Sequence, residues 1–96
     1  MLLRKHIHLK EEVSAAVCNY FSIDPKIFYS KNAKPEIAHP RFVAWDILKN
    51  HYGLSSVTIA QMYNERHHTG ILRGIARVDK LKLNEDRDKI IAYLIT

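Results

Sequence analysis

The sequence predicts an all-α fold, a compact bundle of five or six short helices that contains a helix-turn-helix. Apolar residues recur at steps of three and four along most of the chain, which is the spacing of one helix face. Aliphatic helix formers outnumber β-branched runs, and three glycines and three prolines leave little room for long loops. At 96 residues we expect a single domain over residues 1–96, with a core over about 11–83 and a C-terminal helix over about 85–95.

The N-terminal third is predicted to form two helices. Residues 1–10 are a polar lead-in or the first turn of a helix. From Glu11 onward the pattern is helical, and acidic residues suit the positive end of the helix dipole. The apolar face of this helix comprises Val13, Ala16, Val17, Tyr20 and Phe21. An Asp24-Pro25 pair then caps and opens a short second helix, which ends near Tyr29.

A loop and a third helix follow. Residues 30–39 show little periodicity and are predicted to be a loop. Pro40 opens the third helix, with Trp45 on or beside its apolar face. That face comprises Val43, Ala44, Ile47, Leu48 and Tyr52. Gly53 ends this helix as a left-handed cap.

Residues 55–82 are predicted to form the helix-turn-helix. Ser55 or Ser56 caps a short helix over about 57–63, which buries Ile59, Ala60 and Tyr63. A three-residue turn leads into a longer helix over about 67–83. The apolar face of this longer helix comprises Ile71, Leu72, Ile75 and Val78.

Positive charge is concentrated in the helix-turn-helix. The chain has a net charge of +5, and residues 66–82 hold five Lys or Arg against one Asp, a local net charge of +4. Opposite the apolar stripe of the longer helix lie Thr69, Arg73, Ala76, Arg77 and Lys80. A local basic excess favours a polyanionic partner, and the arginines of this face would contact phosphates. The alternative interpretation is a basic helix face that is merely solvated.

A set of motifs recurs in a fixed order along the chain. The helix-turn-helix holds Leu54, Ser55, Ile59, Ala60 and Tyr63, followed by Arg66-His67-His68-Thr69-Gly70-Ile71. Upstream lie the pair Tyr20-Phe21, a basic loop with Ser30-Lys31, and Pro40-Arg41 followed by Ala44. In order and spacing, residues 13–83 resemble the C-terminal DNA-binding domain of the bacterial chromosomal replication initiator DnaA. The resemblance implies a Trp-repressor-like helix-turn-helix fold and sequence-biased binding of double-stranded DNA in replication initiation or regulation.

The resemblance also implies roles for individual residues. The base edges of the major groove, or the adjacent phosphates, would be contacted by Arg66, His67, His68 and Thr69. Lys31 and Lys34 would lie in a loop that approaches the minor groove. Further contacts to the DNA backbone would come from Arg41, Lys49 and Ser55, in addition to Arg73 and Arg77.

Three positions depart from the family's pattern. His67 stands where the family has Asp, Gly70 where it has a second Thr, and Ala33 where it usually places a minor-groove Arg. A histidine in place of the carboxylate should change the preferred base or loosen the preference. Gly70 loses a hydroxyl and costs roughly 1 kcal/mol of helix propensity. These departures support an alternative hypothesis, a protein-interaction module that kept the fold, lost specific DNA binding and binds a replication or regulatory protein.

No catalytic, cofactor or metal site is predicted, so we do not expect an enzyme. Cys18 is the single cysteine and lies on an apolar helix face, which indicates a buried thiol. His6 and His8 are two residues apart and His67 and His68 are adjacent, whereas a helical zinc pair needs a spacing of four. A G-x-x-x-x-G-K-[ST] loop, a signal peptide and a membrane span are absent from the sequence, so we expect no ATPase on this chain and a cytoplasmic, nucleoid-associated location.

Overall fold

The computed structural model describes residues 3–65 and 67–96, and these residues form helices and short connections without a strand. The elements are α1 (Arg4–Phe21), α2 (Pro25–Phe28), α3 (Pro35–Asp46), the π-helical turn η1 (Ile47–His51), α4 (Ser56–Met62), α5 (His68–Lys80) and α6 (Asn84–Leu94). The all-α prediction is confirmed.

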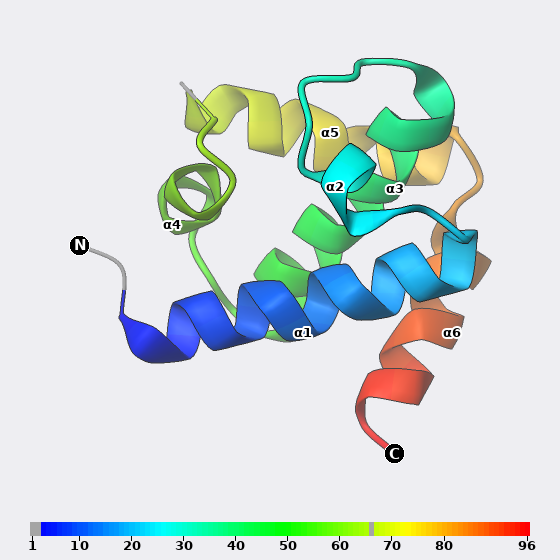
Figure 1. The fold of residues 1–96 in the computed structure, drawn as a ribbon, viewed down its shortest axis with the longest axis horizontal. Coiled ribbons are helices and arrows are strands. Elements are labelled where there is room, and N and C mark those ends of the chain that lie inside the picture. Colours follow the sequence, from blue (N-terminus) through cyan, green and yellow to red (C-terminus); the bar gives the residue numbers. More distant parts are fainter. Residues whose placement is uncertain (1–2, 66) are drawn as a thin grey trace.

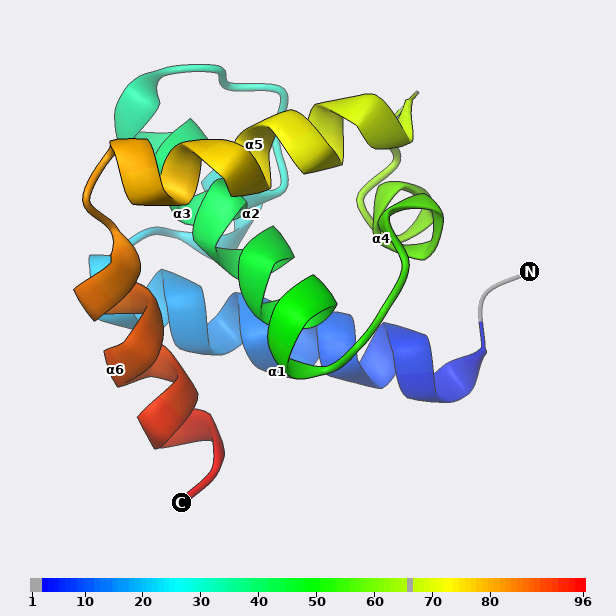
Figure 2. The same ribbon diagram turned by 180° about the vertical axis from the view of Figure 1, so that it is seen from behind.

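Helix α3 is the centre of the fold. It packs against α1 on one side and against α5 on the other. As a result, α1 and α5 lie along opposite edges of the molecule, and α6 lies against α1 on the side away from α5 (Figure 1). The view from behind shows α4 beside the first turn of α5 (Figure 2). The helix-turn-helix therefore lies at an outer edge of the molecule, where a large ligand can reach α5.

Every helix contributes to one core. Its fully buried large side chains include Val13 and Val17 of α1, Phe28 of α2, Val43 of α3, Ile47 and Leu48 of η1, Ile59 of α4, Ile71 of α5 and Ile90 of α6. Burying one such side chain contributes about 1.5–3 kcal/mol. Because α5 and α6 share this core with α1, the position of the helix-turn-helix is set by the whole bundle.

Helix α1 begins earlier than predicted, at Arg4 instead of Glu11. The imidazole Nδ1 of His6 accepts a hydrogen bond from the backbone N–H of Leu3 at 3.4 Å, which satisfies one of the free donors at the helix start. Leu9, one turn further on, packs against the core. Of the two alternatives for residues 1–10, the helical one is therefore confirmed from Arg4 onward, and the polar lead-in is wrong there.

Helix α3 begins at Pro35, so the predicted start at Pro40 is wrong. Pro35 occupies the first helical position, where a missing N–H costs nothing. Pro40 lies buried inside the helix and leaves the Glu36 carbonyl without its usual donor. Burial of Ile37 in the added turn offsets that loss. At the far end the prediction is confirmed, because Gly53 adopts a positive φ of 75° just beyond η1.

The predicted helix caps are confirmed. The Asp24 carboxylate accepts a hydrogen bond from the Lys26 N–H at 2.9 Å at the start of α2. The Ser55 hydroxyl accepts one from the Thr58 N–H at 3.1 Å at the start of α4. Each cap satisfies a helix donor that the backbone cannot satisfy itself.

A buried ion pair joins α6 to α3. The Asp46 carboxylate accepts a hydrogen bond from Nη1 of Arg87 at 3.0 Å and another from the Asn50 amide at 2.6 Å. Asp46 is among the few buried polar residues of the described chain. The contact raises the pKa of Arg87, whose side chain is held at the helix–helix junction.

None of the described helices combines the length and the apolar character that a bilayer span requires.

Candidate nucleic-acid interface

Helices α4 and α5 form the predicted helix-turn-helix. Ser55 caps α4, and α4 packs directly against α5. In the turn between them Asn64 takes a left-handed conformation with φ 56°, and the Glu65 N–H donates to the Ala60 carbonyl at 2.8 Å. His67 is the residue just before α5 and has extended backbone angles. The turn is thus tight, and it places the first residues of α5 at the surface.

One side of α5 is buried and the opposite side is exposed. Ile71, Gly74 and Val78 face the interior. The predicted polar face, from Thr69 through Arg73, Ala76 and Arg77 to Lys80, is exposed throughout. Leu72 was predicted to belong to the apolar face, and this is wrong, since 41% of its surface is accessible.

Gly74 is the interior residue of α5 that the sequence analysis missed. A Cβ atom built on it would lie 2.6 Å from Cδ1 of Phe42 and 2.8 Å from Cε3 of Trp45. Both rings belong to α3, and Trp45 lies in the core. The absence of a side chain at Gly74 therefore allows α5 to approach α3 closely, which fixes how far the exposed side of α5 projects.

The predicted base-contacting residues gather at the N-terminal end of α5. His67, His68 and Thr69 are exposed, and within the described residues their side chains have no hydrogen-bond partner. Arg66 lies outside the residues that the structure describes. The free N–H groups of the first helical turn add donors at the same place. This end of the molecule presents polar groups that a ligand can engage without breaking internal contacts.

The loop after α2 lies along the same edge of the molecule as α5, opposite α1 (Figures 1 and 2). It carries Lys31 and Lys34, which are both exposed. Its half-buried neighbour Arg41, on α3, donates from its guanidinium to backbone carbonyls of this region, including that of Phe28 at 2.7 Å. The phosphate contact expected of Arg41 stays a prediction, but the structure gives this side chain an internal function that the sequence did not reveal.

The remaining predicted contacts differ in their surroundings. Ser55 uses its hydroxyl to cap α4 and also donates to the Thr58 hydroxyl at 2.9 Å. Lys49 lies in η1 and is half-exposed. Arg77 extends over the Phe42 ring, with its guanidinium carbon 5.8 Å from the ring centre. These three roles toward DNA stay predictions.

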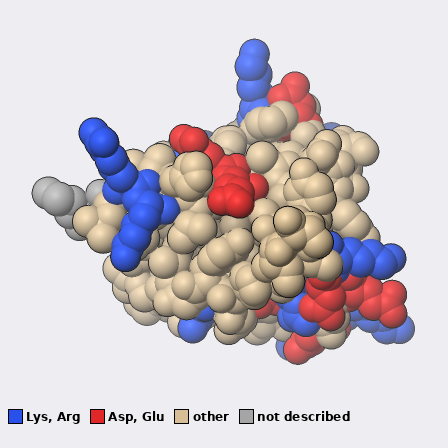
Figure 3. All heavy atoms as spheres, turned by 90° about the horizontal axis from the view of Figure 1, so that it is seen from below, with Lys and Arg blue, Asp and Glu red and all other residues tan. Residues whose placement is uncertain are grey.

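The opposite face of the molecule has a different charge pattern. Viewed from the side of α1, basic and acidic atoms lie close together at one end, an acidic group lies near the centre, and further basic side chains project at the other end (Figure 3). On the edge with α5 and the loop, Lys31, Lys34, Arg73, Arg77 and Lys80 are all exposed. These basic side chains can attract a polyanion to that edge.

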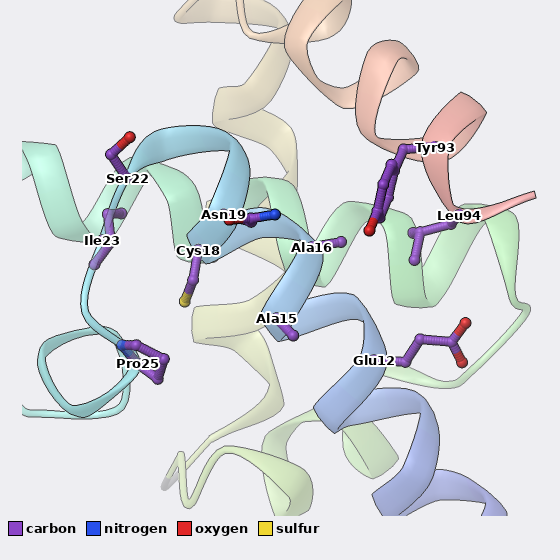
Figure 4. A pocket seen from close by; sticks show the side chains of 10 residues that line it. All are labelled: Glu12, Ala15, Ala16, Cys18, Asn19, Ser22, Ile23, Pro25, Tyr93 and Leu94. Atoms are coloured by element: carbon purple, nitrogen blue, oxygen red, sulfur yellow. The ribbon is translucent and has the colours of Figure 1, made fainter.

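A separate hollow lies away from that edge. It is a groove of about 700 Å³ between α1 and α6. Tyr93 and Leu94 of α6 face Ala15 and Ala16 of α1 across it (Figure 4). Glu12 is the one charged residue among those that line it. The groove thus has none of the basic groups that a nucleic acid needs.

Cys18 is buried, as predicted, and burial raises the pKa of its thiol. A thiol in such surroundings stays protonated and unreactive. No three His, Cys, Asp or Glu side chains come together as a metal-ligand cluster among residues 3–65 and 67–96.

Comparisons with a family profile and with curated proteins both match this chain to bacterial DnaA proteins. The sequence profile of the family described as "Bacterial dnaA protein helix-turn-helix" matches residues 10–78. Similar curated proteins include the chromosomal replication initiator protein DnaA of Thermomicrobium roseum, 34% identical over 70 residues, and that of Chlorobaculum tepidum, 33% identical over 82 residues. The DnaA protein of Zymomonas mobilis is 29% identical over 86 residues.

These alignments cover 73%, 83% and 88% of this chain, but only 15%, 17% and 18% of the respective relatives. The chain thus spans less than a fifth of the length of the curated relatives it matches.

Proposed function

Because the chain belongs to the bacterial DnaA helix-turn-helix family, we propose that it binds double-stranded DNA with a preference for sequence, in replication initiation or its regulation. The observation that supports this most is the exposed N-terminal end of α5, held at the molecular edge by the α4–α5 turn. A helix placed in this way enters the major groove with its first residues at the base edges.

The proposal assigns different tasks to different groups. Arg66, His67, His68 and Thr69 contact bases or the nearest phosphates at the start of α5. Phosphates further along the duplex are contacted by Arg73 and Arg77, with weaker contributions from Lys49 and Ser55. Lys31 and Lys34 approach the minor groove. The task of the chain is binding, and no catalytic step is proposed for it.

The preferred DNA site should differ from that of family members with the common signature. An Asp accepts hydrogen bonds from a base, whereas the imidazole of His67 can donate as well. Gly70 has no hydroxyl to offer, and Ala33 contributes no positive charge to the loop. Both positions are exposed, and a Cβ at Gly70 would have open space around it, so neither residue is required for packing.

Selection from a random duplex pool, followed by fluorescence anisotropy with the selected duplex, tests the proposal. Affinity should fall steeply with salt, with a slope of about −0.9 in log–log form for each neutralised phosphate. Arg66→Ala should cost on the order of 1–3 kcal/mol and relax the selected sequence. Lys89→Ala, which removes an exposed charge from α6, serves as the matched control and should have little effect.

The departures at Ala33, His67 and Gly70 favour a second candidate, a module that binds a replication or regulatory protein and not DNA. At low salt, a random duplex separates the two candidates. DNA-binding proteins bind non-specific duplex with a Kd of about 1–100 μM, so a DNA-binding module should shift the duplex at micromolar concentration. A protein that has lost DNA binding would show no shift.

A further inference from the structure

The loop of residues 29–34, here called the Lys31 loop, has an ordered conformation of its own. The Ser30 hydroxyl donates to the Ile27 carbonyl at 2.6 Å and accepts from the Asn32 N–H at 3.2 Å. The Asn32 side-chain oxygen in turn accepts from the Lys34 N–H at 2.9 Å. Each of these bonds uses a short polar side chain to satisfy nearby backbone, as in other turns. The loop is thus folded back on itself, and both of its lysines are exposed.

Arg41 of α3 donates four hydrogen bonds, two to carbonyls of this loop and two to carbonyls at the end of α2, just before the loop. Its Nε donates to the Phe28 carbonyl at 2.7 Å, and its Nη1 donates to the Asn32 carbonyl at 2.7 Å. Its Nη2 donates to the Ser30 carbonyl at 2.6 Å and to the Ile27 carbonyl at 3.3 Å. A planar guanidinium can reach several carbonyls at once, whereas a lysine ammonium at the end of a flexible stem cannot.

Most of the N–H donors of the Arg41 guanidinium are satisfied within the protein. Of the five N–H donors of a guanidinium, four are engaged by these carbonyls. Burial lowers the pKa of Arg41, and the negative charge of Glu65 acts in the opposite direction. Both residues line the same hollow of about 500 Å³ between the loop and the turn before α5. A phosphate at this point would have to compete with the carbonyl groups and with the Glu65 carboxylate.

We infer that Arg41 is a positioning residue, which holds the Lys31 loop in the conformation that presents Lys31 and Lys34 to DNA without contacting DNA itself. This inference rests on the proposed DNA binding. A loop that is already ordered loses less conformational entropy on binding, so its contacts contribute more to affinity. Two of these hydrogen bonds tie the loop to α3 and the other two tie the end of α2 to it. Because α5 also packs against α3, the loop and the recognition helix share one support.

Hydrogen exchange and DNA binding of Arg41→Lys and Arg41→Ala test the inference. Amide exchange of residues 30–34 should accelerate in both variants, while exchange of α5 stays slow. Affinity for the duplex selected by the wild-type chain should fall on the order of tenfold in both. In a Lys31→Ala/Lys34→Ala background the further effect of Arg41→Lys should largely vanish, because Arg41 acts through these lysines. Lys89→Ala again serves as the matched control.

A direct phosphate contact gives a different pattern. Arg41→Lys would then keep wild-type affinity and wild-type loop exchange, and this result would overturn the inference. The inference would also be overturned if Arg41→Lys lowered the affinity in the Lys31→Ala/Lys34→Ala background by as much as it does in the wild-type chain. Faster exchange in α5 of Arg41→Ala would mean that this variant loosens the whole bundle. The affinity and loop exchange of Arg41→Lys then decide between the two explanations. Failure of the wild-type chain to bind any duplex would refute the proposed function itself, a separate and recognisable outcome.

Discussion

Replacing Gly74 with alanine should destabilise the protein, although alanine is the better helix former. The added Cβ would lie 2.6 Å from Cδ1 of Phe42 and 2.8 Å from both Cε3 and Cζ3 of Trp45. These separations are far below carbon–carbon contact distance, so either the rings or α5 must move. Only 5% of Trp45 is exposed, and its ring packs at 6.2 Å from that of Tyr63, so it has little space into which to move.

Two opposing effects set the size of this change. Alanine is favoured over glycine in a helix interior by about 1 kcal/mol. Overpacking a well-filled contact costs about 1–3 kcal/mol, and two rigid rings at Gly74 place it in the upper part of that range. The net loss of stability should be about 1–2 kcal/mol, and each kcal/mol lowers Tm by roughly 4–8 °C in a domain of this size.

Gly70 provides the matched control on the same helix. Nothing lies within 4 Å of a Cβ built there, and its φ is not positive. Gly70→Ala should therefore stabilise the protein by about 0.5–1 kcal/mol. Urea unfolding, followed by circular dichroism and by fluorescence of the single tryptophan, compares the two variants. A Gly74→Ala protein as stable as the wild type would refute the argument that close approach of α5 to α3 requires glycine.

Three further substitutions test other contacts, each by urea unfolding. Asp46→Ala should destabilise the protein by about 1–2 kcal/mol, because it removes the buried partner of Arg87 at the α3–α6 junction, while Arg87 keeps its pair with the exposed Asp88; unchanged stability would show that the Asp46–Arg87 pair contributes little. Ser55→Ala removes the cap of α4 and should cost about 1 kcal/mol, and unchanged stability would argue against that cap. Tyr63→Phe should cost about 1–2 kcal/mol by leaving the buried Ser14 hydroxyl without its partner at 2.5 Å, and it should cost much less in a Ser14→Ala background.

Local signals in the sequence predicted the fold well where a residue's conformation depends on its neighbours in the chain. Asp24 and Ser55 cap helices because their side chains reach N–H groups two or three residues away. Gly53 ends a helix because its own φ is positive. Each of these outcomes follows from contacts within one turn, and such contacts can be inferred from the order of residues alone.

The errors occurred where contacts distant in sequence decided the outcome. Pro40 was expected to start a helix, but burial of Ile37 extends α3 by a full turn before it. Gly74 gave no signal as an interior residue, since its closeness to α3 is a property of two helices together. Arg41 looks like any surface arginine in the sequence, and its four carbonyl partners become visible only once the loop is folded.

On the proposed function, the position of α5 and the DNA sequence it prefers depend on separate sets of residues. Ile71, Gly74 and Val78 determine where the helix lies, because they are buried against the rest of the bundle. His67 and Gly70 are exposed and take no part in that packing. A change at the second set can therefore alter the DNA site that is recognised while the helix keeps its position, which is how this chain can depart from the family's signature and still have the family's fold. The same separation predicts that Gly70→Thr should change the selected DNA sequence with little effect on stability, whereas substitutions at Gly74 should weaken binding to every sequence by displacing the helix.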